Sequence, residues 1–256
     1  MQPLTDRDFR SDVAGLYRRL HRGQTLERAR ALREKYAARR LGRATVRERF
    51  EALAGIRDES DADLEGMSQL GHALQTANAI RRDMGREGLG EDWIVLGLIH
   101  DLGKILLEHG EPQEFVVGDT HPLGCAFSPA IRHAEFLPGN PDADDPRYAT
   151  RCGIYAEGCG LDAVTMSYGH DEYLYWIARD HVPYEVAWEI RYHSFQSVAG
   201  EYLHLFDARD IELRESHMKP FARYDLYTKD PDDVSSEHLD EYLDLLERRF
   251  PAALSW

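Results

Sequence analysis

The chain has 256 residues, of which 43% are hydrophobic and 10% are aromatic. A chain of this length and composition can bury a substantial core, which excludes an intrinsically disordered protein. The formal net charge is −15 at pH 7. Nucleic-acid binding is not expected, because phosphate backbones are bound by clusters of basic side chains.

The three cysteines, Cys125, Cys152 and Cys159, do not have the spacing of a metal finger. Reduced thiols in a cytoplasmic protein fit this odd number best. No apolar run approaches the roughly 20 residues that span a bilayer, and the N-terminus has no signal-peptide core. We therefore expect a soluble cytoplasmic protein, a monomer without membrane contact.

Apolar residues recur at helical spacing along nearly the whole chain, which predicts a single all-α domain. An acidic loop is expected at 58–63. The Gly- and Pro-rich stretch 109–161 is typical of a functional or mobile insertion, within which 115–120 would suit a short hairpin. Helices are expected at 13–41, 46–56, 68–82, 93–109, 161–180, 183–192 and 236–250.

The dipeptide His100-Asp101 lies inside an apolar run. Two adjacent ligand-type residues in a buried helix are costly unless a cation or a partner compensates them. In a helix, Asp101 lies about 100° around the axis from His100, and Lys104 shares the face of His100. Gly97 and Gly103 weaken a helix by about 1 kcal/mol each relative to Ala, which indicates close approach of another backbone or a ligand. The dipeptide alone also fits a buried His–Asp pair without a metal.

Four further residues are candidate metal ligands: His72, His170, His193 and Asp225. Each of them, taken alone, is more typical of a structural residue. The remaining histidines lie in more polar or helix-end settings and are interpreted as surface residues. They are His21, His109, His121, His133, His181, His204, His217 and His238.

The order of these candidates resembles that of the HD-domain superfamily, which consists of helical bundles that bind divalent metals. The additional pair His170 and His193 matches the members with two metals. The resemblance implies two ions, with Asp101 bridging them through one oxygen to each. The first ion would be held by His72, His100, Asp101 and Asp225, and the second by Asp101, His170 and His193.

At a closer level the chain resembles the inositol oxygenase family from about Phe9 to Trp256. Between Asp58 and His72 it is one residue longer than the family pattern. Ten segments match in the same order, which makes chance similarity improbable. They are 71–77, 97–104, 110–113, 116–120, 145–148, 159–162, 167–173, 191–195, 225–229 and 254–256.

This resemblance implies an HD-domain-like bundle in which residues 1–66 form an N-terminal helical extension with a loop that covers the site. Residues 67–256 would form the catalytic core of the same domain. Members are non-haem di-iron enzymes that cleave the ring of myo-inositol with O₂, giving D-glucuronate and water. The resemblance therefore implies two irons per chain, mixed-valent Fe²⁺/Fe³⁺ in the active form.

By matching motifs, the resemblance also implies functional roles for individual residues. Asp101 and Lys104 would act in catalysis. The substrate would be contacted by Arg10, Asp58, Asp61, Lys104, Gly118, Asp119, Ser194 and Lys229. Bland interpretations stay open: a helix lysine that reaches solvent for Lys104, a packed hydroxyl for Ser194, a turn residue for Asp119 and solvated loop charges for Asp58, Asp61 and Lys229. Asp171 repeats the His-Asp dipeptide, but the family pattern uses only His170.

Three other functions stay open. An HD-type phosphohydrolase would use the lysines to bind phosphate and a metal-bound hydroxide to attack phosphorus. A metal-free binding or sensor protein could keep the fold. An oxygenase of another cyclitol, or of a phosphorylated inositol, would differ only in the fine placement of hydrogen-bonding groups.

Overall fold

The computed structural model describes residues 6–60, 67–226 and 234–256, with side chains of the first helix from Val13 onward. The fold is all-α, as the sequence predicts. The α-helices are α1 (Asp6–Gly23), α2 (Leu26–Ala37), α3 (Val46–Ala52), α4 (Gln69–Glu87), α5 (Glu91–Ile99), α6 (His170–Ala178), α7 (Tyr184–Tyr192), α8 (Ala208–Leu213), α9 (Lys219–Asp225) and α10 (Leu239–Arg249). Shorter 3₁₀ segments are Leu53–Gly55, Leu102–His109, Gln113–Phe115, Ala134–Gly139, Leu161–Ala163, His193–Phe195 and Ala199–Leu205.

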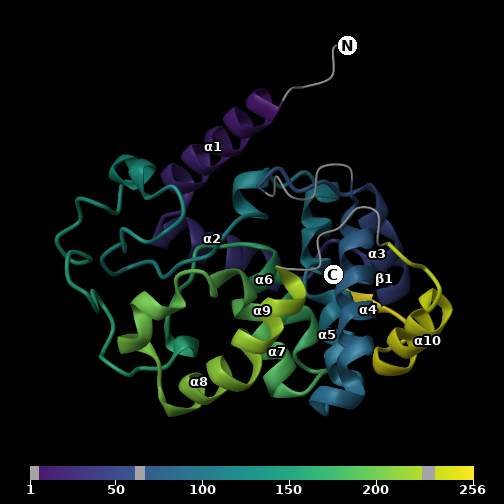
Figure 1. Ribbon diagram of the computed structural model, residues 1–256. Coiled ribbons are helices and arrows are strands. Elements are labelled where there is room, and N and C mark those ends of the chain that lie inside the picture. Colours follow the sequence, from purple (N-terminus) through teal and green to yellow (C-terminus); the bar gives the residue numbers. More distant parts are fainter. Residues whose placement is uncertain (1–5, 61–66, 227–233) are drawn as a thin grey trace.

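Five helices (α4, α5, α6, α7 and α9) lie together in the centre of the molecule (Figure 1). Helix α1 runs along one edge, and the long irregular segment between α5 and α6, drawn in teal, packs beside it. Strands β1 (Arg43–Ala44) and β2 (Leu254–Ser255) pair antiparallel and join the C-terminus to the N-terminal part. None of the described helices is long and apolar enough to cross a bilayer.

One large core joins the N-terminal helices to the central bundle. Leu32 of α2 and Phe50 of α3 belong to the same buried cluster as Leu96 of α5 and the C-terminal Trp256. Burying these side chains removes apolar surface from water, which is the main force that holds the two parts together. The predicted boundary between the N-terminal extension and the catalytic core, at residues 66 and 67, borders residues 61–66, which the structure does not describe. This boundary stays a prediction.

The prediction of one helix over 13–41 is wrong, because the chain turns between α1 and α2. Thr25 caps α2 by accepting a hydrogen bond from the backbone N–H of Arg28 at 3.1 Å. The buried Gln24 side chain donates to the carbonyl of Tyr168 at 2.7 Å and accepts from its N–H at 2.9 Å. These contacts fix the turn against a segment 144 residues away, which helical spacing could not reveal.

A continuous helix over 93–109 is also wrong, because α5 ends at the motif itself. His100 is the C-cap of α5, and Asp101 has φ −93° and ψ 0° before a 3₁₀ segment begins. The backbone N–H of Lys104 consequently donates to the carbonyl of Asp101, three residues back, at 3.0 Å. Lys104 therefore pairs with Asp101, whereas the spacing predicted that it shares a face with His100.

The two glycines beside the motif allow the close approach that the sequence indicates. A Cβ on Gly97 would lie 2.8 Å from the Ile80 side chain and 3.2 Å from the backbone of Ala77. A Cβ on Gly103 would lie 2.2 Å from the carbonyl oxygen of His170. Any larger residue would push α4 or α6 away from the motif, so these positions bring the candidate ligands together.

The remaining helix predictions are confirmed with shifted ends, except for one. Residues 46–56 form α3 and a 3₁₀ turn, and 68–82, 183–192 and 236–250 correspond to α4, α7 and α10. The predicted helix 161–180 begins only at His170, after a short 3₁₀ turn at Leu161–Ala163. The hairpin at 115–120 is absent from these described residues, which form a 3₁₀ turn and loop.

The sequence analysis missed helices α8 and α9. They are joined by a π-helical turn at Arg214–Met218, and Pro220 lies in the first turn of α9. A proline normally argues against a helix interior, but here the regular hydrogen-bond pattern is already interrupted by the π-helical turn directly before it. This irregular helix ends at Asp225 and carries that residue to the centre.

The prediction that all eight remaining histidines lie on the surface is wrong for His21 and His121, each 1% exposed. The ring of His21 makes a 2.7 Å contact from Nε2 to the Arg132 carbonyl. Both ring nitrogens of His121 lack a hydrogen-bond partner within the described part of the chain. Their sequence neighbours are polar, so the sequence gives no sign that these two rings are buried. The packing of α1 against the insertion buries them.

Candidate metal centre

A pocket of about 390 Å³ opens over the central helices. This is the size of a site for a small molecule. Most of its lining is polar. The lining residues are Tyr17, Asp58, Ser60, His72, Asp101, Lys104, Gly118, Asp119, Arg132, His170, His193, Ser194, Gln196, Ser197, Asp225 and Leu226.

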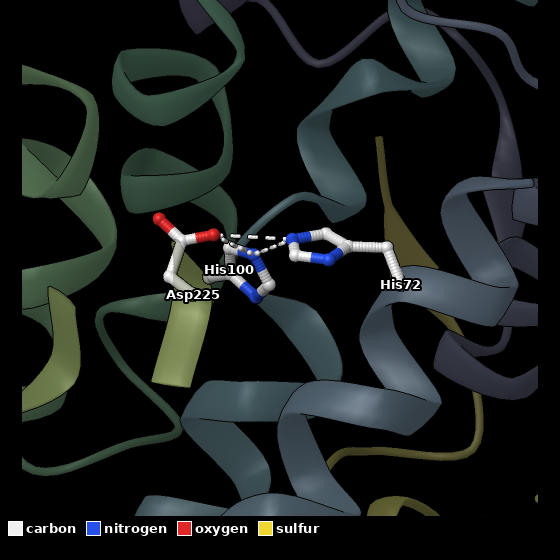
Figure 2. Close-up of side chains that lie close together, drawn as sticks. All are labelled: His72, His100 and Asp225. Carbon is white, nitrogen blue, oxygen red and sulfur yellow. Dashed lines mark hydrogen bonds and ion pairs between the residues drawn. The ribbon is translucent and has the colours of Figure 1, made fainter. Parts of the chain in front are cut away.

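A first group of ligand-type side chains consists of His72, His100 and Asp225, which point toward one another from α4, α5 and α9 (Figure 2). The Nε2 atom of His72 lies 3.1 Å from Asp225 Oδ1 and 3.2 Å from Nε2 of His100. His100 Nε2 lies 3.4 Å from the same carboxylate oxygen. These three atoms enclose a space suited to one cation.

A second group consists of Asp101, His170 and His193. Asp101 Oδ1 lies 3.0 Å from His170 Nε2 and 3.6 Å from His193 Nε2, and the two Nε2 atoms are 3.2 Å apart. The other oxygen of Asp101, Oδ2, faces the first group at 3.5 Å from His100 Nε2. Asp101 therefore lies between the two groups and presents one oxygen to each.

The backbone fixes the orientation of three of the four imidazoles. Nδ1 of His100, His170 and His193 contacts the carbonyl of Gly97, Val116 and Ile190 at 3.0, 2.7 and 2.9 Å, respectively. A carbonyl only accepts, so each Nδ1 carries the proton and donates it. In the neutral ring each Nε2 then presents a lone pair, the arrangement found in metal-bound histidines.

This arrangement is unfavourable for the side chains alone. When His170 and His193 are both neutral with the proton on Nδ1, neither facing Nε2 atom can donate a hydrogen bond to the other across 3.2 Å. All six residues are buried, with exposed fractions of at most 8%. A cation accepted by these lone pairs and carboxylates removes the conflict, and four nitrogens with two carboxylates suit iron and other first-row transition metals.

The local electrostatics keep both carboxylates of the two groups ionised. Burial opposes the charge, but neighbouring groups hold the pKa of Asp101 and of Asp225 well below its usual value. For Asp101 the largest opposing influence is the Lys104 ammonium, and for Asp225 it is the adjacent His100 imidazole.

Lys104 is 5% exposed and does not reach solvent. Its ammonium donates to Asp101 Oδ2 and contacts Asp58 Oδ2, each at 2.8 Å, and donates to Gln69 Oε1 at 3.0 Å. Burial disfavours its charge, but the carboxylates of Asp101 and Asp58 outweigh burial and raise the pKa of Lys104. The interpretations without a role in the site, in which Lys104 reaches solvent and Asp58 is a solvated loop residue, are therefore wrong.

Of the other predicted substrate contacts, three line the pocket and three have side chains outside the described part of the structure. Gly118, with φ +89°, Asp119 and Ser194 line the pocket together with Asp58 and Lys104. Asp61 and Lys229 lie outside the described residues, and so does the side chain of Arg10.

Sequence reasoning missed several pocket residues because they lie in irregular segments or on a buried helix face. Ser60 was missed although it lies in the acidic loop, two residues from the predicted contact Asp58. Tyr17, Arg132, Gln196, Ser197 and Leu226 carry no periodic or motif signal. Asp171 was set aside, yet its Oδ1 atom lies 2.8 Å from Nε2 of His170.

A family model described as myo-inositol oxygenase matches residues 10–256. Inositol oxygenase 1 of Arabidopsis thaliana is 44% identical over 96% of this chain and 81% of its own length. A probable inositol oxygenase of Oryza sativa subsp. japonica is 42% identical over 95% of this chain and 80% of its own length.

An animal protein is also similar along almost the whole chain. Inositol oxygenase of Homo sapiens is 37% identical over 99% of this chain and 88% of its own length. Matches of this identity along almost the entire chain leave room for no other family. The chain belongs to the myo-inositol oxygenase family.

Proposed function

We propose that this protein is an inositol oxygenase, which cleaves the ring of myo-inositol with O₂ to give D-glucuronate and water. The observation that carries the proposal is the pair of neighbouring His/Asp groups, with Asp101 between them, on the wall of a polar pocket. Family membership supports the substrate and the use of O₂.

The cofactor in this proposal is a pair of iron ions per chain, mixed-valent when active. His72, His100 and Asp225, with one oxygen of Asp101, would hold the first ion. His170 and His193, with the other oxygen, would hold the second. When bound, the irons supply the one-electron chemistry and the O₂ activation that protein side chains lack.

The side chains of the pocket would bind and orient the polyol. Each ring hydroxyl loses water on entry and needs a partner. Asp58, Asp119, Ser194 and the backbone at Gly118 would provide several of these partners. In the family-based proposal Arg10, Asp61 and Lys229 complete the set.

The charge of Lys104 has a chemical consequence. The carboxylates of Asp101 and Asp58 raise the pKa of Lys104 and favour its ammonium form. Beside a substrate oxygen it would stabilise developing negative charge. Asp101 and Lys104 are thus the proposed catalytic residues, joined by their 2.8 Å contact.

The decisive experiment is O₂ uptake by the Fe²⁺-loaded protein with myo-inositol, followed by product identification. We expect one D-glucuronate for each O₂ consumed. No uptake, together with hydrolysis of a phosphoester by the Mn²⁺-loaded protein without O₂, would establish the phosphohydrolase instead. Fewer than one iron per chain after reconstitution would favour the metal-free binding protein.

The choice of cyclitol needs a competition assay, because hydroxyl stereochemistry is read by small differences in donor placement. We propose myo-inositol as the preferred substrate over its stereoisomers and its phosphates. The ratio of kcat/KM values measures this preference, and a larger value for another cyclitol would reassign the substrate.

We further propose that the protein acts as a cytoplasmic monomer that binds neither nucleic acid nor membranes. The net charge of −15 supports the absence of polyanion binding. Light scattering after size exclusion tests the monomer, for which a mass near 29.4 kDa is expected.

A further inference from the structure

Asp171 lies beside the second His/Asp group although it was no candidate in the sequence. Its side chain is 1% exposed at the start of α6. Asp171 Oδ1 approaches His170 Nε2 to 2.8 Å, closer than the 3.0 Å between that nitrogen and Asp101 Oδ1. Two carboxylates thus face the same imidazole nitrogen.

The backbone bond of His170 explains why this approach points to a cation. Nδ1 of His170 donates a hydrogen bond to the Val116 carbonyl at 2.7 Å, which leaves Nε2 to face the carboxylates. A carboxylate oxygen at 2.8 Å from this nitrogen requires positive charge between them, either a proton on Nε2 or a bound cation in its place. Asp171 therefore contributes negative charge to the space that Asp101, His170 and His193 enclose.

The same carboxylate also holds two segments of the pocket wall. Its Oδ1 atom accepts a hydrogen bond from the Ser194 hydroxyl at 3.1 Å. Its Oδ2 atom accepts one from the Thr120 hydroxyl at 3.5 Å, and the Thr120 backbone N–H donates to the Ser194 carbonyl at 3.0 Å. One buried side chain thereby links the loop beside Asp119 to the end of α7.

We propose that Asp171 is a positioning residue that strengthens binding of the second cation and orients the Ser194 hydroxyl toward the substrate. It acts through His170 and Ser194 and does not itself touch the substrate. The proposal rests on the proposed function for its substrate, but its effect on the cation is independent of any substrate.

Charge balance supports this role. His170 and His193 are neutral ligands, and Asp101 is shared with the first ion, so the second ion has little negative charge of its own. Surplus positive charge in a buried site is costly. Asp171 supplies an additional negative charge at the side of the second group, where it is needed. Groups that support a metal ligand in this way change metal affinity by about 10–100-fold.

The first test is an anaerobic Fe²⁺ titration of the metal-free protein, with bound iron measured by elemental analysis. We expect two ions per wild-type chain, and in Asp171→Ala one ion with unchanged affinity and one weakened by roughly 10–100-fold. Asp171→Asn preserves size but not charge and should weaken the same ion if the alanine variant does not fold.

A matched control is Asp210→Asn. Asp210 is a 4% exposed carboxylate that accepts from the Trp188 indole at 2.9 Å and from the Leu161 N–H at 2.7 Å, and it does not line the pocket. This variant should lose stability yet bind both ions as the wild type does. Two ions of wild-type affinity in Asp171→Asn would overturn the role of Asp171 at the cation.

The second test is a double-mutant cycle on anaerobic binding of myo-inositol to metal-loaded protein. Ser194→Ala should weaken binding in the wild type but have no further effect in the Asp171→Ala background, because the hydroxyl there already lacks its orienting acceptor. Additive losses would overturn the Ser194 part. If the wild type does not bind myo-inositol, the proposed function fails, and the iron titration alone decides the role of Asp171.

Discussion

At the scale of single residues, the centre depends on charges that compensate one another out of water. Lys104 contacts Asp101 and Asp58 at 2.8 Å each, and all three side chains are at most 6% exposed. A buried charge without its partners would be costly, so these three groups act as one unit. All three line the pocket, and the unit includes the carboxylate that lies between the two His/Asp groups.

Replacement of Lys104 by alanine should therefore impair catalysis while iron remains bound. The six candidate ligands are unchanged, but the positive charge beside the substrate is lost. We expect kcat to fall about 10²–10³-fold, the range for removal of one charge-stabilising donor. Turnover and iron content of the reconstituted variant measure this.

Lys35→Ala provides the control, because Lys35 is a half-exposed lysine that pairs with Glu111 away from the pocket. It should keep wild-type kcat. Wild-type turnover in Lys104→Ala would refute the catalytic role of this lysine.

The buried His121 predicts a pH dependence of stability. Burial lowers its pKa to about 3, from 6.5 in the unfolded chain, with a smaller influence from the neighbouring His21. Between these values the unfolded state binds more protons, so stability decreases as pH falls below 6.5 and is fully retained above it. At pH 5 the loss is about 2 kcal/mol from this group alone.

Replacement by phenylalanine should remove this loss, because the ring contact with Phe127 can persist without a titratable nitrogen. Urea unfolding of both proteins at pH 5 and pH 7.5 tests the prediction. The difference between the two stability changes isolates His121, since every other group titrates in both. Equal pH dependence in the two proteins would contradict it.

At the scale of secondary-structure elements, helix ends and close crossings position the ligands. His100 and His193 are C-caps, His170 begins α6, and Asp225 ends α9. Helix ends project side chains from rigid elements while leaving the backbone free to turn. The crossing of the 3₁₀ segment Leu102–His109 against α6 is so close that only glycine fits at position 103.

Gly103→Ala should therefore disturb the metal centre as well as the fold. Its Cβ would lie 2.2 Å from the His170 carbonyl oxygen, and relief would require backbone movement between Asp101 and His170. We expect a stability loss of about 1–3 kcal/mol and weaker iron binding. Thermal unfolding and iron titration measure the two effects.

Gly85→Ala is the matched control, because nothing lies within 4 Å of a Cβ at that exposed position of α4. It should gain about 0.5–1 kcal/mol from lower unfolded-state entropy. A neutral effect of Gly103→Ala would contradict the crossing described above.

At the scale of the whole molecule, one centre connects helices that are far apart in the sequence. The candidate ligands lie within α4, α6 and α9 or directly after the C-terminal ends of α5 and α7. A metal bound at their meeting point stabilises only the folded arrangement, since the unfolded chain holds no such site. Metal binding and global stability are therefore coupled.

Chelation should lower the thermal midpoint of the entire protein in one cooperative transition. Saturation at 1,000 times Kd is worth about 4 kcal/mol per site. Calorimetry of Fe²⁺-loaded and chelated protein tests this. Asp101→Ala, which removes the shared carboxylate, should bind neither ion properly and show no metal-dependent shift, whereas a full shift in that variant would contradict the shared role of Asp101.

Much of this fold could be predicted from local patterns. The amphipathic helices α4, α7 and α10 follow from apolar spacing, because a helix with one apolar face packs the same way in many contexts. The turn at Gln24, the break after Ile99 and the π-helical turn before α9 could not be predicted, because contacts with distant segments determine them. The cluster around His100-Asp101 was predictable because burying two adjacent ligand-type residues is costly unless a cation or a partner compensates them.

The sequence alone determined the all-α class, the six candidate ligands and the family, since each depends on residue types and their order. Only the tertiary structure decided that Asp101 lies between two groups, that Lys104 is buried against Asp58 and that Asp171 faces His170. These facts depend on side-chain orientations and on distances between segments that lie far apart in the sequence. Chain order does not encode such distances directly, because packing of the complete core establishes them.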